Sequence, residues 1–215
     1  AGLDALWAAV QADVARERGA AAWLRSRPTP HRTALAAIGA SLVPLLVWWL
    51  WGRSDRAVYP VGRWVLDLAV LLSPVVVALA VVMRPIHRPS WPRWVERAVV
   101  AFAAAAALVG PMLQPAHQDH PASLGGTGDA LLPAAAVCMT LGTLLGVPLL
   151  LWLVSLRRQA ERWSRPAWGV AAGAGAAGGL SIFLHCPIVA PEHLLLGHAT
   201  VLLPFALLAW IGLRR

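Results

Sequence analysis

The chain contains no lysine, since all 18 of its basic residues are arginine. This absence excludes a retinal Schiff base, a pyridoxal phosphate lysine and a P-loop lysine. Charged residues are also scarce, at 13% of 215 residues, whereas 59% are hydrophobic. A soluble domain is about 25% charged and about 45–50% apolar, so the composition excludes a soluble globule. It equally excludes a disordered chain, which would be polar and highly charged.

Cysteine is scarce as well. The two cysteines, Cys138 and Cys186, are too few for a disulfide scaffold, and three readings stay open: one disulfide, a redox pair or two buried apolar side chains. The sequence also lacks HExxH, GxSxG and paired carboxylates within its apolar runs. We therefore expect no enzymatic activity.

Six continuous apolar runs of 16–25 residues have the length of helices that cross a bilayer, and none alternates as a barrel strand does. The runs are residues 33–51, 64–83, 98–113, 130–154, 167–184 and 194–213. The predicted fold is an all-α membrane protein, a six-transmembrane-helix bundle over residues 33–215. It follows an N-terminal segment, residues 1–32, which is polar and charged, so no signal peptide is expected.

Arginine is distributed unevenly between the two sides of this topology. Fifteen arginines lie on the side of the termini, and only Arg53, Arg56 and Arg63 lie on the other. The positive-inside rule then places both termini in the cytoplasm. The net charge of +8 thus indicates a lipid partner rather than direct nucleic-acid binding.

The fifth apolar run is rich in small residues. Gly169/Gly173 and Gly175/Gly179 form two small-xxx-small pairs, which allow close approach of neighbouring helices. We expect this helix at the centre of the bundle, with a homodimer through the same face as the alternative. The only acid within a run, Asp67, lies four residues after Arg63. This spacing predicts an ion pair near the outer interface, and a proton relay is the alternative.

Residues 2–18 have the apolar periodicity of a helix. The apolar positions form one stripe, here called the N-terminal stripe: Leu3, Leu6, Trp7, Val10 and Val14. One helix of this length cannot bury its own stripe. The stripe must dock into a partner's groove, lie on lipid or pack on the bundle. Because the polar face mixes acidic and basic residues, we favour the partner.

Histidine and cysteine gather toward the outer ends of runs three to six, at His117, His120, Cys138, His185, Cys186, His193 and His198. His193 and His198 are five residues apart, so on an α-helix they would not share a face and no zinc pair is expected there. Two interpretations of the histidines stay open: they are interfacial side chains that reach water, or they form a metal- or oxidant-sensing site. A haem protein with His185 and His198 as axial ligands is a further alternative.

The two cysteines are expected at different depths. Cys186 ends the fifth run, and Cys138 lies about 10 Å below the outer end of the fourth. Their Cα atoms are then expected to exceed the roughly 7 Å limit for a disulfide. We predict two free thiols at rest, with a metal or an oxidant drawing the fourth and fifth helices together.

Residues 156–215 carry the most specific pattern: a basic run, the Gly/Ala-rich helix, HCP at 185–187, a histidine early in the last run and a terminal arginine pair. This pattern resembles the NrsF-like negative regulators of extracytoplasmic-function sigma factors, which are six-span anti-sigma proteins of the bacterial inner membrane. Cys138 in the fourth run is a second shared feature. GRSD at 52–55 is similar to the family's Arg-Pro-Asp segment, with Ser54 in place of proline.

The resemblance implies that the N-terminal segment holds a sigma factor at the membrane and that the cysteine pair senses metal or oxidative stress. The candidate ligands for such a metal are Cys138, Cys186 and His185. No cofactor is expected beyond a transient metal ion. The rival function is a small metal-handling transporter that uses the outer histidines and Asp67.

Overall fold

The computed structural model describes residues 2–16, 23, 26–57, 59–83, 91–112, 131–156, 167–188 and 190–213. The longer helices are α1 (Leu3–Arg16), α3 (Thr29–Trp51), α4 (Val61–Val82), α5 (Arg93–Met112), α6 (Leu131–Leu156), α7 (Ala167–His185) and α9 (Leu202–Leu213). Between α7 and α9 lie the short helix α8 (Pro191–His193), the π turn η3 (Leu194–His198) and the 3-10 turn η4 (Ala199–Val201). No strand occurs within these ranges, so the prediction of an all-α fold is confirmed for them.

Four helical segments of the described chain are long and apolar enough to cross a membrane: Thr29–Trp51, Val61–Val82, Leu131–Val154 and Pro191–Ile211. They correspond to the first, second, fourth and sixth predicted runs. Helices α5 and α7 correspond to the third and fifth runs, but neither is among the helices that are long and apolar enough to cross a membrane. The first span begins at Thr29, four residues before the predicted Thr33, because Pro30 lies in the first turn of the helix, where proline is favoured.

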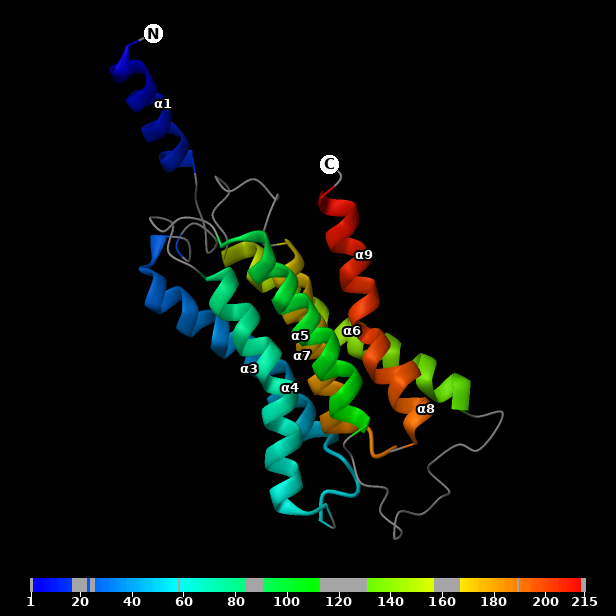
Figure 1. Ribbon diagram of the computed structural model, residues 1–215. Coiled ribbons are helices and arrows are strands. Elements are labelled where there is room, and N and C mark those ends of the chain that lie inside the picture. The colour runs from blue at the N-terminus through cyan, green and yellow to red at the C-terminus, as the bar shows by residue number, and fades with distance from the viewer. Residues whose placement is uncertain are drawn as a thin grey trace.

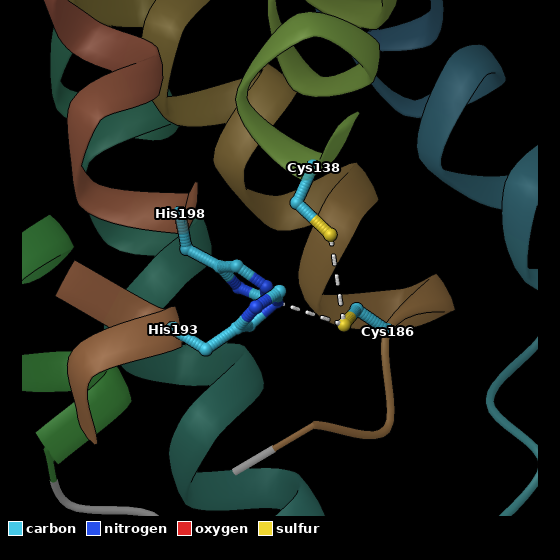
Figure 2. A group of neighbouring side chains, drawn as sticks. All are labelled: Cys138, Cys186, His193 and His198. Atoms are coloured by element: carbon cyan, nitrogen blue, oxygen red, sulfur yellow. Dashed lines mark hydrogen bonds between the residues drawn. The ribbon is translucent and has the colours of Figure 1, made fainter. Parts of the chain in front are cut away.

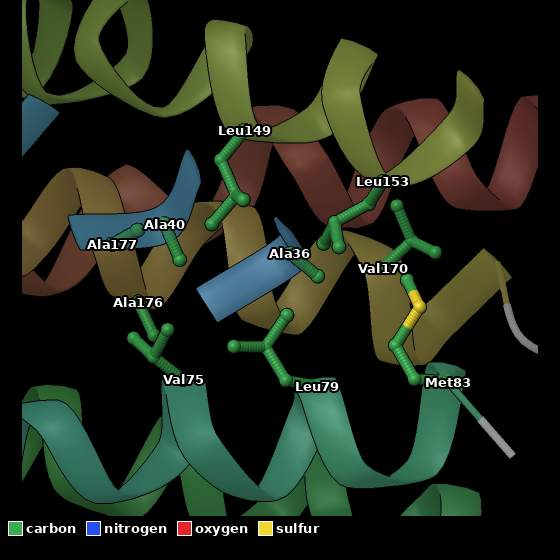
Figure 3. Packing of buried hydrophobic residues seen from close by; sticks show 10 residues of the cluster. All are labelled: Ala36, Ala40, Val75, Leu79, Met83, Leu149, Leu153, Val170, Ala176 and Ala177. Carbon is green, nitrogen blue, oxygen red and sulfur yellow. The ribbon is translucent and has the colours of Figure 1, made fainter. Parts of the chain in front are cut away.

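Helix α7 lies at the centre of the bundle, as its small residues predict. It contacts α3, α4, α5, α6 and α9, and nearly all of its side chains from Gly169 to Leu184 are buried. Figure 3 shows part of this core, where Ala176 of α7 lies beside Val75 of α4 and Val170 of α7 lies near Met83. Small side chains allow the helix backbones to approach closely, and the resulting van der Waals contacts stabilise the association of the helices.

The glycines of α7 pack against three different neighbouring helices. A Cβ at Gly173 would lie 3.0 Å from the Cβ of Ala78 on α4, and one at Gly175 would lie 2.6 Å from Leu202 of α9. A Cβ at Gly178 would overlap the backbone carbonyl of Gly142 on α6. The closest approach therefore lies at Gly178, which the predicted Gly175/Gly179 pair does not include. The faces of α7 that carry small residues are therefore packed against other helices of the same chain.

Replacing Gly178 with alanine is expected to destabilise the bundle by about 1–3 kcal/mol, the usual cost of overpacking a well-packed core. Thermal unfolding of the detergent-solubilised protein measures this effect. Gly62→Ala is the matched control, because a Cβ at Gly62 has nothing within 4 Å. An unchanged melting temperature for Gly178→Ala would contradict the close contact between α6 and α7.

Helix α1 stands apart from the bundle (Figure 1). It lies toward the same end as the C-terminal end of α9, and α8 lies at the opposite end. Two regions that matter for function thus lie at opposite ends of the described structure. The N-terminal stripe is at one end, and the turn between α7 and α9 is at the other.

Candidate metal centre

Two cysteines and two histidines meet at the end of the bundle opposite to α1. We call Cys138, Cys186, His193 and His198 the Cys–His cluster. Cys138 lies on α6, Cys186 directly follows α7, His193 ends α8 and His198 ends the π turn η3. Figure 2 shows the four side chains pointing toward one another. Cys138 and the stretch 186–198, which begins 48 residues later, therefore supply one compact group of sulfur and nitrogen atoms.

The ligand atoms of the cluster all lie within 4.8 Å of one another. The Sγ atoms of Cys138 and Cys186 are 3.7 Å apart, and Cys186 Sγ is 3.4 Å from Nε2 of His193. Each residue is buried, with 7%, 4%, 0% and 4% exposure for Cys138, Cys186, His193 and His198. Both thiols are free, as predicted. Because the sulfurs are already this close, a metal ion could bridge them without the approach of the two helices that the sequence predicts.

Hydrogen bonding within the cluster favours the thiolate of Cys186. The Cys138 thiol donates to Cys186 Sγ, and His193 and His198 interact with the same sulfur. The bond from Cys138 stabilises the negative sulfur and lowers the pKa of Cys186 below its ordinary value, although burial opposes the shift. A thiolate is the form that binds metals and reacts with oxidants.

The π turn brings the two histidines onto one side of the last helical segment. The backbone N–H of Ala199 donates to the carbonyl of Leu194, five residues earlier. A π turn is wider than an α turn, so residues five apart come within roughly 50° of each other instead of about 140°. The rings of His193 and His198 accordingly lie 5.4 Å apart, edge to face. The expectation that these histidines do not pair is therefore wrong, and their burial speaks against the alternative of side chains that reach water.

Gly197 permits the π turn to lie directly on α6. A Cβ at this position would be 3.2 Å from the Cβ of Cys138 and 3.2 Å from the carbonyl oxygen of Ala135. Ile182 packs with both cysteines, and Leu145 and Ile188 complete the apolar contacts around them. The surroundings of the cluster are thus apolar, and its polar atoms are paired mainly with one another.

His185 does not belong to the cluster, in contrast to the predicted ligand set. Its Nδ1 lies 2.8 Å from the carbonyl oxygen of Trp51, at the end of α3. The adjacent Cys186 points instead toward Cys138 and His193. Neighbouring residues at the end of a helix point in different directions, so sequence adjacency to Cys186 misled the assignment. His185 helps to join α3 to α7.

A buried ion pair joins the segment after α3 to the end of α7. Arg53 donates to both carboxylate oxygens of Asp55, at 2.8 and 2.7 Å, and its exposure is only 1%. Its Nη1 also donates to the carbonyl of Phe183, and its backbone N–H donates to the carbonyl of Leu184. These contacts satisfy carbonyls that the last turn of a helix leaves unpaired. From the sequence, Arg53 is a charge on the outer side and part of the GRSD segment, and its pairing with Asp55 was not predicted.

Changing Asp55 to asparagine is expected to destabilise the protein by about 3–5 kcal/mol, because it leaves the guanidinium of Arg53 buried without its counter-charge. Thermal unfolding in detergent again provides the measurement. The double variant Arg53→Met/Asp55→Leu removes both charges and should recover most of the loss. Equal loss in the single and the double variants would show that the charge pairing does not matter.

The predicted ion pair between Arg63 and Asp67 is present, with Arg63 Nε 3.6 Å from Asp67 Oδ1. The hydroxyl of Tyr59 also donates to Asp67 Oδ2, at 2.5 Å. Burial, together with this hydrogen bond, raises the pKa of Tyr59 above its ordinary range, so the phenol stays a donor. Asp67 is thus held between two partners, which supports the structural reading of this pair over a proton relay.

Most of the N-terminal stripe is exposed to solvent. The exposed fractions are 85% for Leu3, 67% for Leu6, 63% for Trp7 and 46% for Val10. Val14 continues α1, but its side chain lies outside the described part of the chain, as do His117 and His120. The four described side chains have no cover from the bundle. They form an unpartnered apolar face.

Comparisons with models of protein families, with curated proteins and with solved structures find no match to this chain. The functional argument therefore depends on two features of the molecule itself. These are the exposed stripe of α1 at one end and the buried Cys–His cluster at the other.

Proposed function

We propose that this chain is an anti-sigma factor of the bacterial inner membrane, which sequesters an extracytoplasmic-function sigma factor and releases it on a metal or oxidative signal. The observation that carries the proposal is the apolar stripe of α1, which lies apart from the bundle with Leu3, Leu6 and Trp7 more than 60% exposed. An amphipathic helix of this kind lays its apolar face into a hydrophobic groove of a partner. The resemblance of residues 156–215 to NrsF-like regulators supports a sigma factor as the partner.

The charge of α1 suits a partner that binds DNA. Asp4 lies in the first turn of the helix and is exposed. A sigma factor presents basic surfaces to DNA, so acidic groups beside the stripe would face them and oppose polymerase binding. This chain would act on transcription through the sigma factor, without contacting nucleic acid.

In the proposed topology six helices cross the membrane and both termini lie in the cytoplasm. The distribution of fifteen arginines to three supports it. So does the position of α1 and the end of α9 at one end of the bundle. Trp48, Trp49 and Trp51 are exposed at the other end of the first span, where an aromatic belt would meet the outer interface.

Reporter fusions to the C-terminus test this topology. A reporter active only in the cytoplasm should give full signal, and one active only in the periplasm should give none. A fusion after Trp51, in the first outer segment, provides the inverse control. Activity of the periplasmic reporter at the C-terminus would contradict the topology and, with it, access of α1 to a sigma factor.

The signal would be received at the Cys–His cluster. In this topology the cluster lies on the periplasmic side, where thiols are open to oxidation. Two thiols 3.7 Å apart can also be joined by a thiophilic metal ion or by oxidation. Peroxide would convert the two thiols into one disulfide while it is itself reduced to two water molecules.

Co-purification from native membranes tests the function. A tagged full-length chain should retain a sigma subunit of RNA polymerase, and a brief exposure of the cells to cadmium should reduce the amount retained. A transporter would instead retain no sigma subunit, and its overexpression would change the cellular metal content. Absence of any sigma subunit in untreated cells would overturn the proposal.

A further inference from the structure

Two distances within the Cys–His cluster match those between the ligands of one tetrahedral ion, and all four ligand atoms lie within 4.8 Å of one another. Zinc binds sulfur at about 2.3 Å and imidazole nitrogen at about 2.0–2.1 Å. At tetrahedral angles two sulfur ligands are then about 3.8 Å apart, and a sulfur and a nitrogen ligand about 3.5 Å apart. The corresponding distances here are 3.7 Å between the sulfurs and 3.4 Å from Cys186 Sγ to His193 Nε2.

We propose that Cys138, Cys186, His193 and His198 form a complete four-coordinate site for a thiophilic divalent cation of the Zn²⁺ and Cd²⁺ class. The site specifies the signal-receiving element of the proposed function and rests on that function for its role. Its existence depends only on the geometry of the four side chains.

The four ligands indicate which metal the site would bind and whether the site would be structural or catalytic. Two sulfur and two imidazole ligands in a tetrahedral arrangement favour zinc and its heavier analogue cadmium over magnesium or calcium, which prefer oxygen. Four protein ligands leave no position for water or substrate, which is the pattern of structural or regulatory zinc sites. All four residues are at most 7% exposed, so the ion would be shielded from solvent.

The π turn is the element that makes the ligand set complete. In an α-helix His198 would point away from His193 and the cluster would have only three members. The π turn Leu194–His198 corrects this orientation, and π turns occur frequently at functional sites. Gly197 then brings the turn onto Cys138 by leaving out a side chain between them. The π turn and Gly197 thus both bring the four ligand atoms together.

The histidine rings are oriented by the cluster alone. His193 Nδ1 and His198 Nε2 are buried and have no hydrogen-bond partner among the described residues. The other nitrogen of His193 faces Cys186. Buried polar atoms are rarely left unpaired. Among the described residues, the hydrogen-bond interactions of these two rings are thus with Cys186, a member of the cluster.

The test uses the full-length protein in detergent, stripped of metal with a chelator and titrated with Co²⁺ as a spectroscopic probe, followed by competition with Zn²⁺ and Cd²⁺. We expect about one Co²⁺ per chain, with the visible absorption of a tetrahedral cobalt thiolate that Zn²⁺ removes. Removing a ligand should cost more than the 10–100-fold typical of an outer partner. His193→Ala and His198→Ala should therefore each weaken binding by more than about 100-fold.

His185→Ala is the matched control, because His185 is adjacent to Cys186 and contacts Trp51 instead of the cluster. It should leave affinity and spectrum unchanged. Gly197→Ala retains all four ligands and should still weaken binding, because the new side chain separates the π turn from α6. Circular dichroism and thermal unfolding identify variants that fail to fold. For these, alkylation of Cys138 and Cys186 in the unmodified chain replaces the titration, with Zn²⁺ expected to slow the reaction.

Two results would overturn the proposal. The first is the absence of stoichiometric binding or of thiol protection in the unmodified chain. The second is full affinity and an unchanged spectrum in folded His193→Ala and His198→Ala variants, which would leave the cysteines as the only ligands. Neither result involves a sigma factor. A protein that binds the ion without retaining a sigma factor would refute the proposed function and leave this site intact.

Discussion

The double variant Trp7→Ala/Val10→Asp is expected to lose the sigma factor from the membrane while the bundle stays folded. Trp7 is 63% exposed and Val10 46% exposed in α1, so neither side chain contributes to the bundle's core. A buried apolar anchor in a groove typically contributes about 2 kcal/mol or more, which corresponds to about a thirtyfold loss of affinity. The added aspartate would place an unpaired charge in an apolar groove and increase the loss. Pull-down with the purified sigma factor measures it.

Ala5→Asp is the matched control for this experiment. Ala5 is exposed on the side of α1 away from Trp7 and Val10, and an acidic residue is tolerated in the first turn of a helix. It adds the same charge and should leave binding unchanged. Undiminished retention of the sigma factor by Trp7→Ala/Val10→Asp would show that the N-terminal stripe is not the binding surface.

The double variant Cys138→Ser/Cys186→Ser is expected to bind the sigma factor normally and to lose the entire response to cadmium or peroxide. Serine keeps the size of the side chain, and the two residues lie at the opposite end of the bundle from α1. The variant removes both thiolate ligands and both oxidisable groups. A transcriptional reporter driven by the sigma factor, with and without each stressor, gives the measurement.

His185→Ala again provides the control and should respond as the unmodified chain does, because it is not a member of the cluster. A normal response of Cys138→Ser/Cys186→Ser would reduce the cysteines to packing residues around Ile182. Sensing would then have to occur elsewhere on the outer side or in the lipid.

The helical fold could be predicted because it depends on properties that single residues carry. Continuous apolar runs predict membrane helices whatever their neighbours are, and four of the six runs have the expected length and composition in the structure. The central position of α7 followed from its glycines, since only small side chains allow several helices to approach one. The tightest glycine, Gly178, could not be identified, because its contact with Gly142 depends on the register between two helices.

The candidate site was only partly predictable, for a related reason. Cys138 and Cys186 stood out by their rarity, but the partners of a buried cluster are set by three-dimensional approach. In an α-helix His193 and His198 would point in different directions, and the π turn between them changes this orientation. A signal that could have been used is LLLG between the two histidines, where Gly197 marks a close approach. The burial of Arg53 and its pairing with Asp55 were not predicted, because an arginine in a loop is usually solvated.

The geometry gives α7 a central part in connecting the two ends of the molecule. Its C-terminal end is held by Arg53 and precedes Cys186, and its body contacts α3, α4, α5, α6 and α9. An ion at the Cys–His cluster would join the end of α7 to α6 and to the segment before α9. Coupling between distant sites requires an element with two arrangements, and the helices packed on α7 are the candidate.

The central claim is that one molecule couples the Cys–His cluster to the N-terminal stripe. It is tested most directly by measuring the affinity of the purified sigma factor for the full-length chain in lipid bilayers, once free of metal and once loaded with Cd²⁺. Allosteric coupling of this kind typically changes affinity by about 5–150-fold. We predict that the loaded protein binds the sigma factor at least about tenfold more weakly. Equal affinity in the two states, with the ion demonstrably bound, would contradict the account.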